Sequence, residues 1–255
     1  MDTELLIERF RNLIDETEFD PADIDYSILA GHVRLLDRIA MIENSSLTVF
    51  DMFQKRYVFV RNRFMEILGY DAEQAAGEGF PYFFRIMHPD DVPMVLDTTT
   101  RAMRFMMKVP PAERQDYKTV FEHRLRDTSG RYIRLLQQEA VLELDLKGNL
   151  WLIMILVDVC PNQQETKSFQ RSIINIRTGR TLLFNEDRQG PGTTLSQREV
   201  EILEYLGRGF FSKEIADRLF ISVNTVNNHR QNIIRKMGLT NTTEAITYAH
   251  KIGIV

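Results

Sequence analysis

The stretch from Asn224 to Met237 carries the side chains best suited to contact a partner molecule. It holds three basic residues and no acidic one. Val226, Ile233 and Met237 recur at helical spacing and predict a buried stripe, which leaves a row of carboxamides on the other face. A carboxamide can form two hydrogen bonds with a base edge, adenine above all, whereas arginine and lysine suit phosphates and guanine. The carboxamides belong to Asn224, Asn227, Asn228, Gln231 and Asn232.

This polar face differs from that of an ordinary solvated helix. A solvated face is usually rich in Glu and Lys, and so many Asn residues lower helix propensity. A demand other than solubility is therefore expected to have placed them there. We predict that this face contacts DNA.

Three further helices are predicted around this segment. Ser196 to Glu199 forms a capping box that opens a helix ending at Gly207. A short helix follows over 212–220, and Ser222 can cap the polar helix after a tight turn at Ile221. A fourth helix opens at 241–244 and ends near Gly253. Two short helices, a tight turn and a longer helix are the order of a helix-turn-helix.

A recognisable pattern runs without a gap through this region, in Leu195–Leu203, Gly209, Ser212–Ala216, Leu219, Ile221-Ser222, Thr225-Val226, His229, Asn232-Ile233, Lys236–Gly238 and Glu244-Ala245. At these residues the chain resembles the DNA-binding domain of LuxR-type transcriptional regulators. The resemblance implies that the third helix enters the major groove and that the fourth often forms a dimer contact. It also implies that His229 packs at a helix junction.

The resemblance assigns DNA contacts by position. The residues expected at base edges are Asn227, Asn228 and Gln231. The residues expected at or near phosphates are Lys213, Ser222, Thr225 and Arg230, together with the basic side chains of Arg235 and Lys236. Asn227 departs from the family, which usually has Lys there, and we expect this departure to shift base preference toward adenine.

The remaining 190 residues differ from this region in charge. The whole chain of 255 residues, long enough for two domains of ~100–150 residues, has a net charge of −4. Residues 1–190 hold 24 Lys and Arg against 30 Asp and Glu, whereas 191–255 hold eight against six. The stretch 185–192 combines charged residues with Gly-Pro-Gly and is predicted to be a linker. The acidity is therefore confined to the N-terminal part, and it does not argue against nucleic acid as a partner.

Composition also predicts a compartment. The single cysteine, Cys160, excludes an internal disulfide framework and a multi-cysteine zinc site, and it fits a reducing cytosol. The start of the chain is acidic where a secretory signal would be basic. No apolar run approaches the ~20 residues that cross a bilayer. We expect a cytoplasmic protein with no membrane segment and no metal site.

The N-terminal part is predicted to be α+β, an antiparallel sheet with helices gathered on one face. Apolar stripes predict a helical lead-in over 1–44, the second of them formed by Ile28, Val33, Leu36 and Ile39. A hairpin is also predicted over 172–184. The sheet strands are expected at 47–53, 57–60, 117–126, 131–144 and 150–159, with turns at 127–130 and 146–149 and helices between the second and third strands.

Several short segments of this part resemble a PAS domain: Asn62–Phe64, Leu68–Tyr70, His88–Asp91, Glu122–Arg131 and Val157-Asp158. PAS domains sense ligands or cofactors, or simply dimerise, so the resemblance implies a sensor without naming its ligand. The expected organisation is a helical lead-in at 1–44, a PAS-like sensor at 45–160, a connector at 161–192 and the LuxR-type domain at 193–255. A phospho-acceptor receiver does not fit the helical start, and Trp151 is alone where the lactone-binding relatives have a tryptophan pair.

The residues expected in the interior of the sensor allow two interpretations. Eight of the 11 methionines lie between Met52 and Met154 among many aromatics, which suits an adaptable pocket and equally an ordinary core. We favour the core, predict no cofactor and leave a small-molecule ligand possible. Cys160 lacks the setting for a flavin adduct. His88 and His123 could serve as haem ligands, but we expect both to be structural.

The sequence thus predicts a DNA-binding transcription regulator that acts as a homodimer and whose PAS-like domain senses a small molecule or a protein. The alternative is a protein-interaction switch with a ligand-free PAS core used for dimerisation. Catalytic motifs such as Gly-x-Ser-x-Gly, a phosphate-binding Gly-rich loop or His-Glu-x-x-His are missing from the sequence. We therefore expect no enzymatic activity and no catalytic residues.

Overall fold

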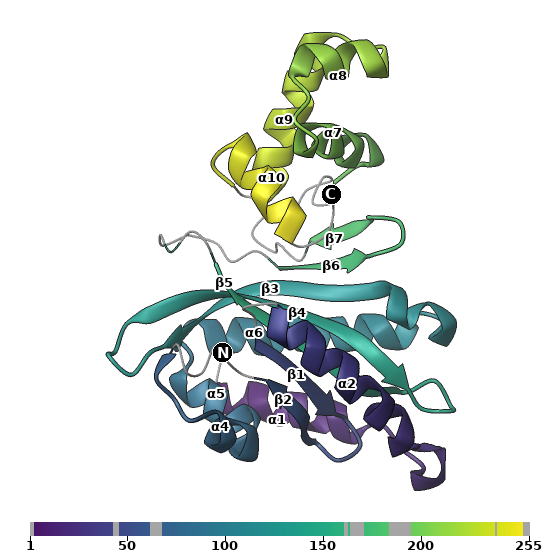
Figure 1. The fold of residues 1–255 in the computed structure, drawn as a ribbon, viewed down its shortest axis with the longest axis vertical. Coiled ribbons are helices and arrows are strands. Elements are labelled where there is room, and N and C mark those ends of the chain that lie inside the picture. The colour runs from purple at the N-terminus through teal and green to yellow at the C-terminus, as the bar shows by residue number, and fades with distance from the viewer. Residues whose placement is uncertain are drawn as a thin grey trace. The chain divides into compact units, whose positions relative to one another are not determined.

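The computed structural model describes residues 3–42, 46–61, 68–160, 163, 171–183, 195–237 and 239–251. The chain divides into two compact units, Met1–Phe169 and Gln170–Val255, called here the N-terminal unit and the C-terminal unit (Figure 1). The predicted linker at 185–192, the Asn62–Phe64 motif and the end of the fourth helix beyond residue 251 lie outside the described residues. Within the described ranges, no helix has the length and apolar character needed to cross a membrane.

The N-terminal unit is built on an antiparallel sheet whose strands lie in the order β2-β1-β5-β4-β3. Strands β3 and β5 have the predicted bounds, and the other three differ from prediction by one or two residues at an end. The strands are β1 (Ser46–Asp51), β2 (Arg56–Arg61), β3 (Tyr117–Arg126), β4 (Tyr132–Leu144) and β5 (Leu150–Val159).

Two aspartates fix the predicted turns between the long strands. Oδ1 of Asp127 accepts the Arg131 backbone N–H at 2.8 Å. Oδ1 of Asp145 likewise accepts the Asn149 N–H at 2.7 Å. Gly148 takes the positive φ of 86° that the second turn requires. These local bonds set the register in which β3, β4 and β5 pair.

Helices cover both faces of this sheet, so the prediction that they gather on one face is wrong. One core cluster joins Phe10 of α1 and Leu96 of α6 to Phe121 and Ile155 of the sheet. A second cluster packs α2 against Trp151 and its neighbours. Strand side chains alternate between faces, so β5 serves both clusters. The helices are α1 (Thr3–Asp15), α2 (Tyr26–Ile42), α4 (Ala72–Glu78), α5 (Phe80–Ile86) and α6 (Asp91–Lys108), with short 3-10 helices at Pro21–Asp23 and Pro111–Asp116.

The buried stripe of α2 is shifted from the predicted one. Leu29, Leu36 and Ala40 are buried, whereas Ile28 and Ile39 are 40% and 39% exposed. Because the helix carries apolar residues on two neighbouring stripes, sequence spacing alone did not decide which stripe faces the sheet.

The C-terminal unit begins with the predicted hairpin and continues as the predicted helix-turn-helix. Strand β6 (Arg171–Asn175) pairs with β7 (Thr181–Leu183) across a turn in which Oδ1 of Asn175 accepts the Thr178 N–H at 2.9 Å. The four helices enclose a core that includes Ile202, Ile215 and Val226. They are α7 (Gln197–Gly207), α8 (Ser212–Leu219), α9 (Val223–Met237) and α10 (Thr242–Lys251). The predicted fold class is confirmed for both units.

Candidate nucleic-acid interface and ligand cavity

Helix α9 is held so that its carboxamide face points outward. Its first turn is capped by Ser222, whose Oγ accepts the Thr225 N–H at 3.0 Å. Val226 and Ile233 are 0% and 1% exposed and anchor the opposite face. The three residues predicted at base edges, Asn227, Asn228 and Gln231, are all exposed. The structure therefore brings them together on one accessible surface of α9.

A chain of hydrogen bonds orients Asn227. The Ser212 hydroxyl of α8 donates to Asn227 Oδ1 at 3.0 Å, and Arg230 Nη1 donates to the same hydroxyl at 2.7 Å. Arg230 Nη2 also donates to Thr242 Oγ1 of α10 at 3.1 Å. The half-buried Arg230 thus ties α8, α9 and α10 together. The Asn227 amide keeps both Nδ2 hydrogens for a partner, because only its oxygen takes part in this chain.

The predicted phosphate contacts differ in accessibility. Lys213, Ser222 and Arg235 are exposed, whereas Thr225 is half-buried. The Lys236 side chain is only 14% exposed, and its Nζ lies 2.6 Å from Oε2 of the buried Glu199. Lys236 therefore fastens the end of α9 to α7, and its charge is directed into the unit.

Glu199 also completes the predicted capping box of α7. Its Oε2 accepts the Ser196 N–H at 2.7 Å, and Ser196 Oγ accepts the Glu199 N–H at 3.2 Å. Burial alone would raise the pKa of Glu199, but the bonds from Lys236 and Ser196 outweigh burial and hold this pKa below its usual value. The carboxylate thus stays charged between α7 and α9.

Two exposed aromatics border α8 and were missed by the sequence analysis. Phe211 precedes the helix and is 77% exposed, and Phe220 follows it and is 95% exposed. Phe220 also has a positive φ of 54°, which is unusual for a bulky side chain. Phe211 lies four residues before Ile215 and Phe220 four residues after Ala216, so helical spacing alone would place both on the buried side of α8, and their exposure is seen only in the structure.

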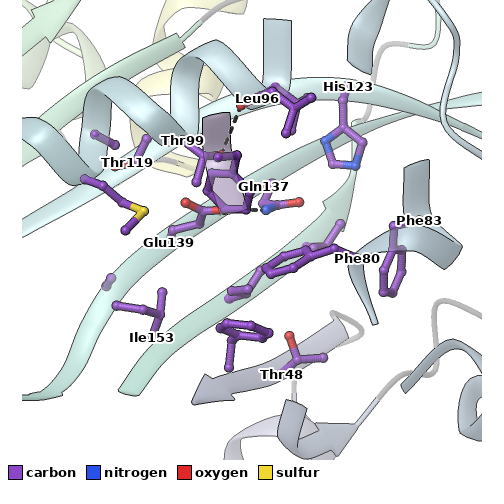
Figure 2. Close-up of a pocket in the computed structure, with 18 of the residues that line it drawn as sticks. Thr48, Phe80, Phe83, Leu96, Thr99, Thr119, His123, Gln137, Glu139 and Ile153 are labelled. Atoms are coloured by element: carbon purple, nitrogen blue, oxygen red, sulfur yellow. Dashed lines mark hydrogen bonds between the residues drawn. The ribbon is translucent and has the colours of Figure 1, made fainter. Parts of the chain in front are cut away.

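The N-terminal unit contains a cavity of about 130 Å³ next to the first core cluster (Figure 2). The sequence favoured a filled core, and the structure shows that the packing leaves space. Its walls come from α1, α5, α6 and all five strands β1 to β5. The apolar lining includes Phe50, Phe80, Phe83, Leu96, Met103 and Ile153.

One side of this lining is polar, and the sequence analysis did not single it out. Gln137 and Glu139 stand two residues apart on β4, so they share one face, and Gln137 Nε2 donates to Glu139 Oε1 at 2.7 Å. Burial raises the pKa of Glu139 to about 7. Burial, followed by the nearby Glu139 charge, raises the pKa of Tyr57 as well. A carboxyl and a phenol therefore lie close together at the cavity.

The two histidines considered as haem ligands have different surroundings. His88 accepts the Asp90 N–H at 3.2 Å in the turn before α6, as expected of a structural residue. His123 is 2% exposed and borders the cavity, and its Nδ1 has no hydrogen-bond partner among the described residues. Burial lowers the pKa of His123 to about 4, so it is neutral at pH 7. Across the described ranges, no group of three His, Cys, Asp or Glu side chains is placed to hold a metal ion.

The raised pKa of Glu139 predicts a pH dependence of stability. The ordinary value of 4.5 applies in the unfolded chain, so between pH 4.5 and about 7 the folded state binds more protons. The free energy of unfolding should therefore fall as pH rises through this window. Glu139→Gln should remove this loss and exceed wild type at pH 8 by roughly 3 kcal/mol, with little difference at pH 4.5.

Urea unfolding followed by Trp151 fluorescence measures this difference, because the only tryptophan lies in the N-terminal unit. Glu143→Gln is the matched control on the same strand, since Glu143 bonds His32 away from the cavity. The difference in free energy of unfolding between wild type and Glu139→Gln should therefore change between pH 5 and pH 8. The same difference at both pH values would contradict the prediction.

The helices and the exposed face of α9 define the C-terminal unit as a helix-turn-helix domain. Residues 193–249 match the family of bacterial regulatory proteins, luxR family. The C-terminal unit therefore contains a luxR-family domain, as the sequence predicted.

The curated relatives share this domain. Oxygen regulatory protein NreC of Staphylococcus aureus, in strain JH9 as in strain JH1, is 46% identical over 61 residues. The match covers 24% of this chain, and the chain spans only 28% of the length of those relatives. The likeness therefore concerns the C-terminal domain alone.

Solved structures with longer alignments are more distant. A phage VqmA–DPO complex is 17% identical and aligns over 88% of this chain and 91% of its own, with a TM-score of 0.33. The Vibrio cholerae VqmA dimer in the absence of target DNA is 16% identical over 86% of this chain and 88% of its own, with a TM-score of 0.33. The PAS-B domain of Drosophila melanogaster Cycle is 15% identical over 45% of this chain and 99% of its own, with a TM-score of 0.34.

Proposed function

We propose that this chain is a cytoplasmic DNA-binding transcription regulator in which the N-terminal unit, a PAS-like sensor, controls the luxR-family domain. The observation that carries the proposal is the exposed row of Asn227, Asn228 and Gln231 on α9, inside a domain that matches this family. The proposal assigns no catalytic step to the chain.

In the proposed complex, α9 lies in the major groove with its carboxamides at base edges. Asn227 can donate from Nδ2 and accept at the free lone pair of Oδ1, which is the pattern complementary to adenine. The exposed Lys213, Ser222 and Arg235 would contact phosphates and fix the register. Thr225 and Arg230 would support them from half-buried positions, whereas Lys236 mainly positions α9.

Salt dependence of binding by the full-length chain tests the proposal. A fluorescein-labelled pool of random 30-base-pair duplexes serves as the probe in anisotropy titrations between 50 and 200 mM salt. Each phosphate contact contributes about 0.9 to the slope of log affinity against log salt, so Lys213→Ala should reduce that slope by about 1. Lys147→Ala, in a turn of the N-terminal unit, is the charge-matched control. Absent or salt-independent binding would refute the proposal.

The departure at Asn227 makes a prediction about base preference. Asn227→Lys should replace an adenine preference by a guanine preference at one position of the site, with a change of 5- to 150-fold, because a good bidentate contact discriminates by about 1–3 kcal/mol. Selection from a randomised duplex pool followed by sequencing measures the preference.

Asn224→Lys is the matched control for this substitution. It adds the same charge to an exposed position of the same helix, one turn nearer its start. An unchanged preference in Asn227→Lys, or the same change in both variants, would contradict the assignment of Asn227 to a base edge.

The proposed regulator acts as a homodimer that places two α9 helices at half-sites about 34–36 Å apart. In support, α2 carries residues at the four-three-four spacing with which two helices pack against each other, at Ile28, His32, Leu35 and Ile39. Leu35 is 58% exposed. Native mass spectrometry of the full-length chain measures the mass of the assembly directly. A monomer at micromolar concentration, both with and without duplex, would contradict the proposed homodimer.

The proposed signal is a small molecule. The cavity supports this version over a switch with a ligand-free core, because a filled core would have left no room for a ligand. If no small molecule binds the N-terminal unit, we expect the signal to be a protein partner.

A further inference from the structure

We propose that the cavity of the N-terminal unit binds a small organic amine or protonated nitrogen heterocycle, with an apolar body of one ring whose nitrogen donates to the carboxylate of Glu139. This inference names the ligand class of the proposed sensor and rests on that function. It follows from the size of the cavity, its walls and the charge that borders it.

The volume limits the ligand to about one ring. An apolar cavity of roughly 150 Å³ inside a protein takes up benzene. The cavity here measures about 130 Å³, so its volume is close to that of a cavity that takes up one six-membered ring.

The walls favour an aromatic or aliphatic ring. Phe50 and Phe80 stand with their ring centroids 4.5 Å apart, and Phe80 and Phe83 both border the space. Figure 2 shows Phe80, Leu96 and Ile153 around the cavity. Aromatic rings pack against one another in edge or offset geometry at such distances, so a ring-shaped guest can join the existing cluster.

The charge at the polar side selects the functional group. Among the described residues that line the cavity, Glu139 is the only acidic side chain, and none of them is a lysine or an arginine. Among the described residues its carboxylate accepts one hydrogen bond, from Gln137 Nε2, and a carboxylate has room for about four. A carboxylate in apolar surroundings is stabilised by a cationic partner, and none of the described residues that line the cavity supplies one.

The other polar groups of the lining do not supply that cation. His123 is neutral at pH 7 because burial depresses its pKa to about 4, and Tyr57 is a neutral phenol. Thr48, Thr99 and Thr119 add hydroxyl groups without charge. A ligand that brings a positive nitrogen therefore completes the site, whereas an anionic ligand of the same size meets repulsion from Glu139.

Isothermal titration calorimetry with the full-length chain at pH 7.5 tests the proposal with four probes of similar size: benzylamine, benzyl alcohol, toluene and benzoate. Wild type should bind benzylamine at least tenfold more tightly than benzyl alcohol and should not bind benzoate. Glu139→Gln should lose the tenfold preference for benzylamine while keeping its affinity for toluene. Glu143→Gln, on the same strand but outside the cavity, should keep the wild-type preference.

The comparison of benzylamine with benzoate uses wild type alone, so it holds even if Glu139→Gln folds poorly. Equal affinity for benzylamine and benzyl alcohol, binding of benzoate, or failure to bind any probe would each overturn the proposal. These titrations contain no DNA. Failure here therefore leaves the salt-dependent DNA binding intact, and failure of DNA binding leaves these affinities unchanged.

Discussion

Replacing Glu199 with alanine is expected to lower the free energy of unfolding of the C-terminal unit by about 3–5 kcal/mol. The substitution removes the buried carboxylate that pairs with the half-buried Lys236 and accepts the Ser196 N–H. The pair with Lys236 holds α7 against α9, and the bond from Ser196 caps the start of α7, so α9 should lose its fixed position together with stability. Affinity of the full-length chain for the random duplex pool should then fall below detection at 150 mM salt.

Urea unfolding with two signals separates the units in this experiment. Circular dichroism at 222 nm follows the helices of both units, whereas Trp151 fluorescence follows the N-terminal unit. Glu199→Ala should move a helical transition to lower urea and leave the Trp151 transition in place. Glu201→Ala is the control on the same helix: its pair with Arg198 is 41% and 34% exposed, so the expected loss is below about 0.5 kcal/mol. Equal shifts in both variants would contradict the assignment.

Replacing Asp91 with alanine is expected to destabilise the N-terminal unit by about 3–5 kcal/mol. Asp91 is 0% exposed and lies at the start of α6. Its Oδ2 accepts the Arg124 backbone N–H at 2.8 Å, and its Oδ1 accepts Nη2 of the same residue at 2.6 Å. These bonds fix α6 against β3. Since both elements line the cavity, affinity for benzylamine should fall together with stability.

Trp151 fluorescence in urea reports this loss directly. The matched control is Asp97→Ala on the same helix, where Asp97 pairs with Arg101 one turn away at 27% and 42% exposure. Such a pair contributes about 0.3–0.5 kcal/mol, so the control should unfold near wild type. If Asp91→Ala unfolds at the same urea concentration as the control, the buried hydrogen bonds of Asp91 contribute little to stability.

The exposed polar face of α9 could be predicted from the sequence because its signal is local. The polar face of α9 follows from the spacing of Val226 and Ile233, and the capping box follows from Ser196 and Glu199. These patterns lie within one or two helical turns. The exposed position of Asn227 could therefore be deduced, whereas its bond to Ser212 could not, because that bond joins two helices.

The cavity could not be predicted because it depends on packing between distant elements. Glu139 and Gln137 look like surface residues of an alternating strand, since β4 has polar side chains at several consecutive positions. Only the arrangement of α5, α6 and the strands shows that this pair faces the interior. The pairing of Lys236 could not be predicted for the same reason. Its type suggested a phosphate contact, which stays a prediction, whereas the buried Glu199 with which it pairs lies 37 residues away in the chain.

The two-faced packing of β5 has a mechanical consequence for the N-terminal unit. Ile153 and Ile155 line the cavity, whereas Leu152 and Met154 pack in the cluster beneath α2. The strand therefore acts as a shared wall, and an occupant that pushes it on one side changes the support of α2 on the other. A signal can cross the sheet through alternate side chains of a single strand, without rearrangement of any loop.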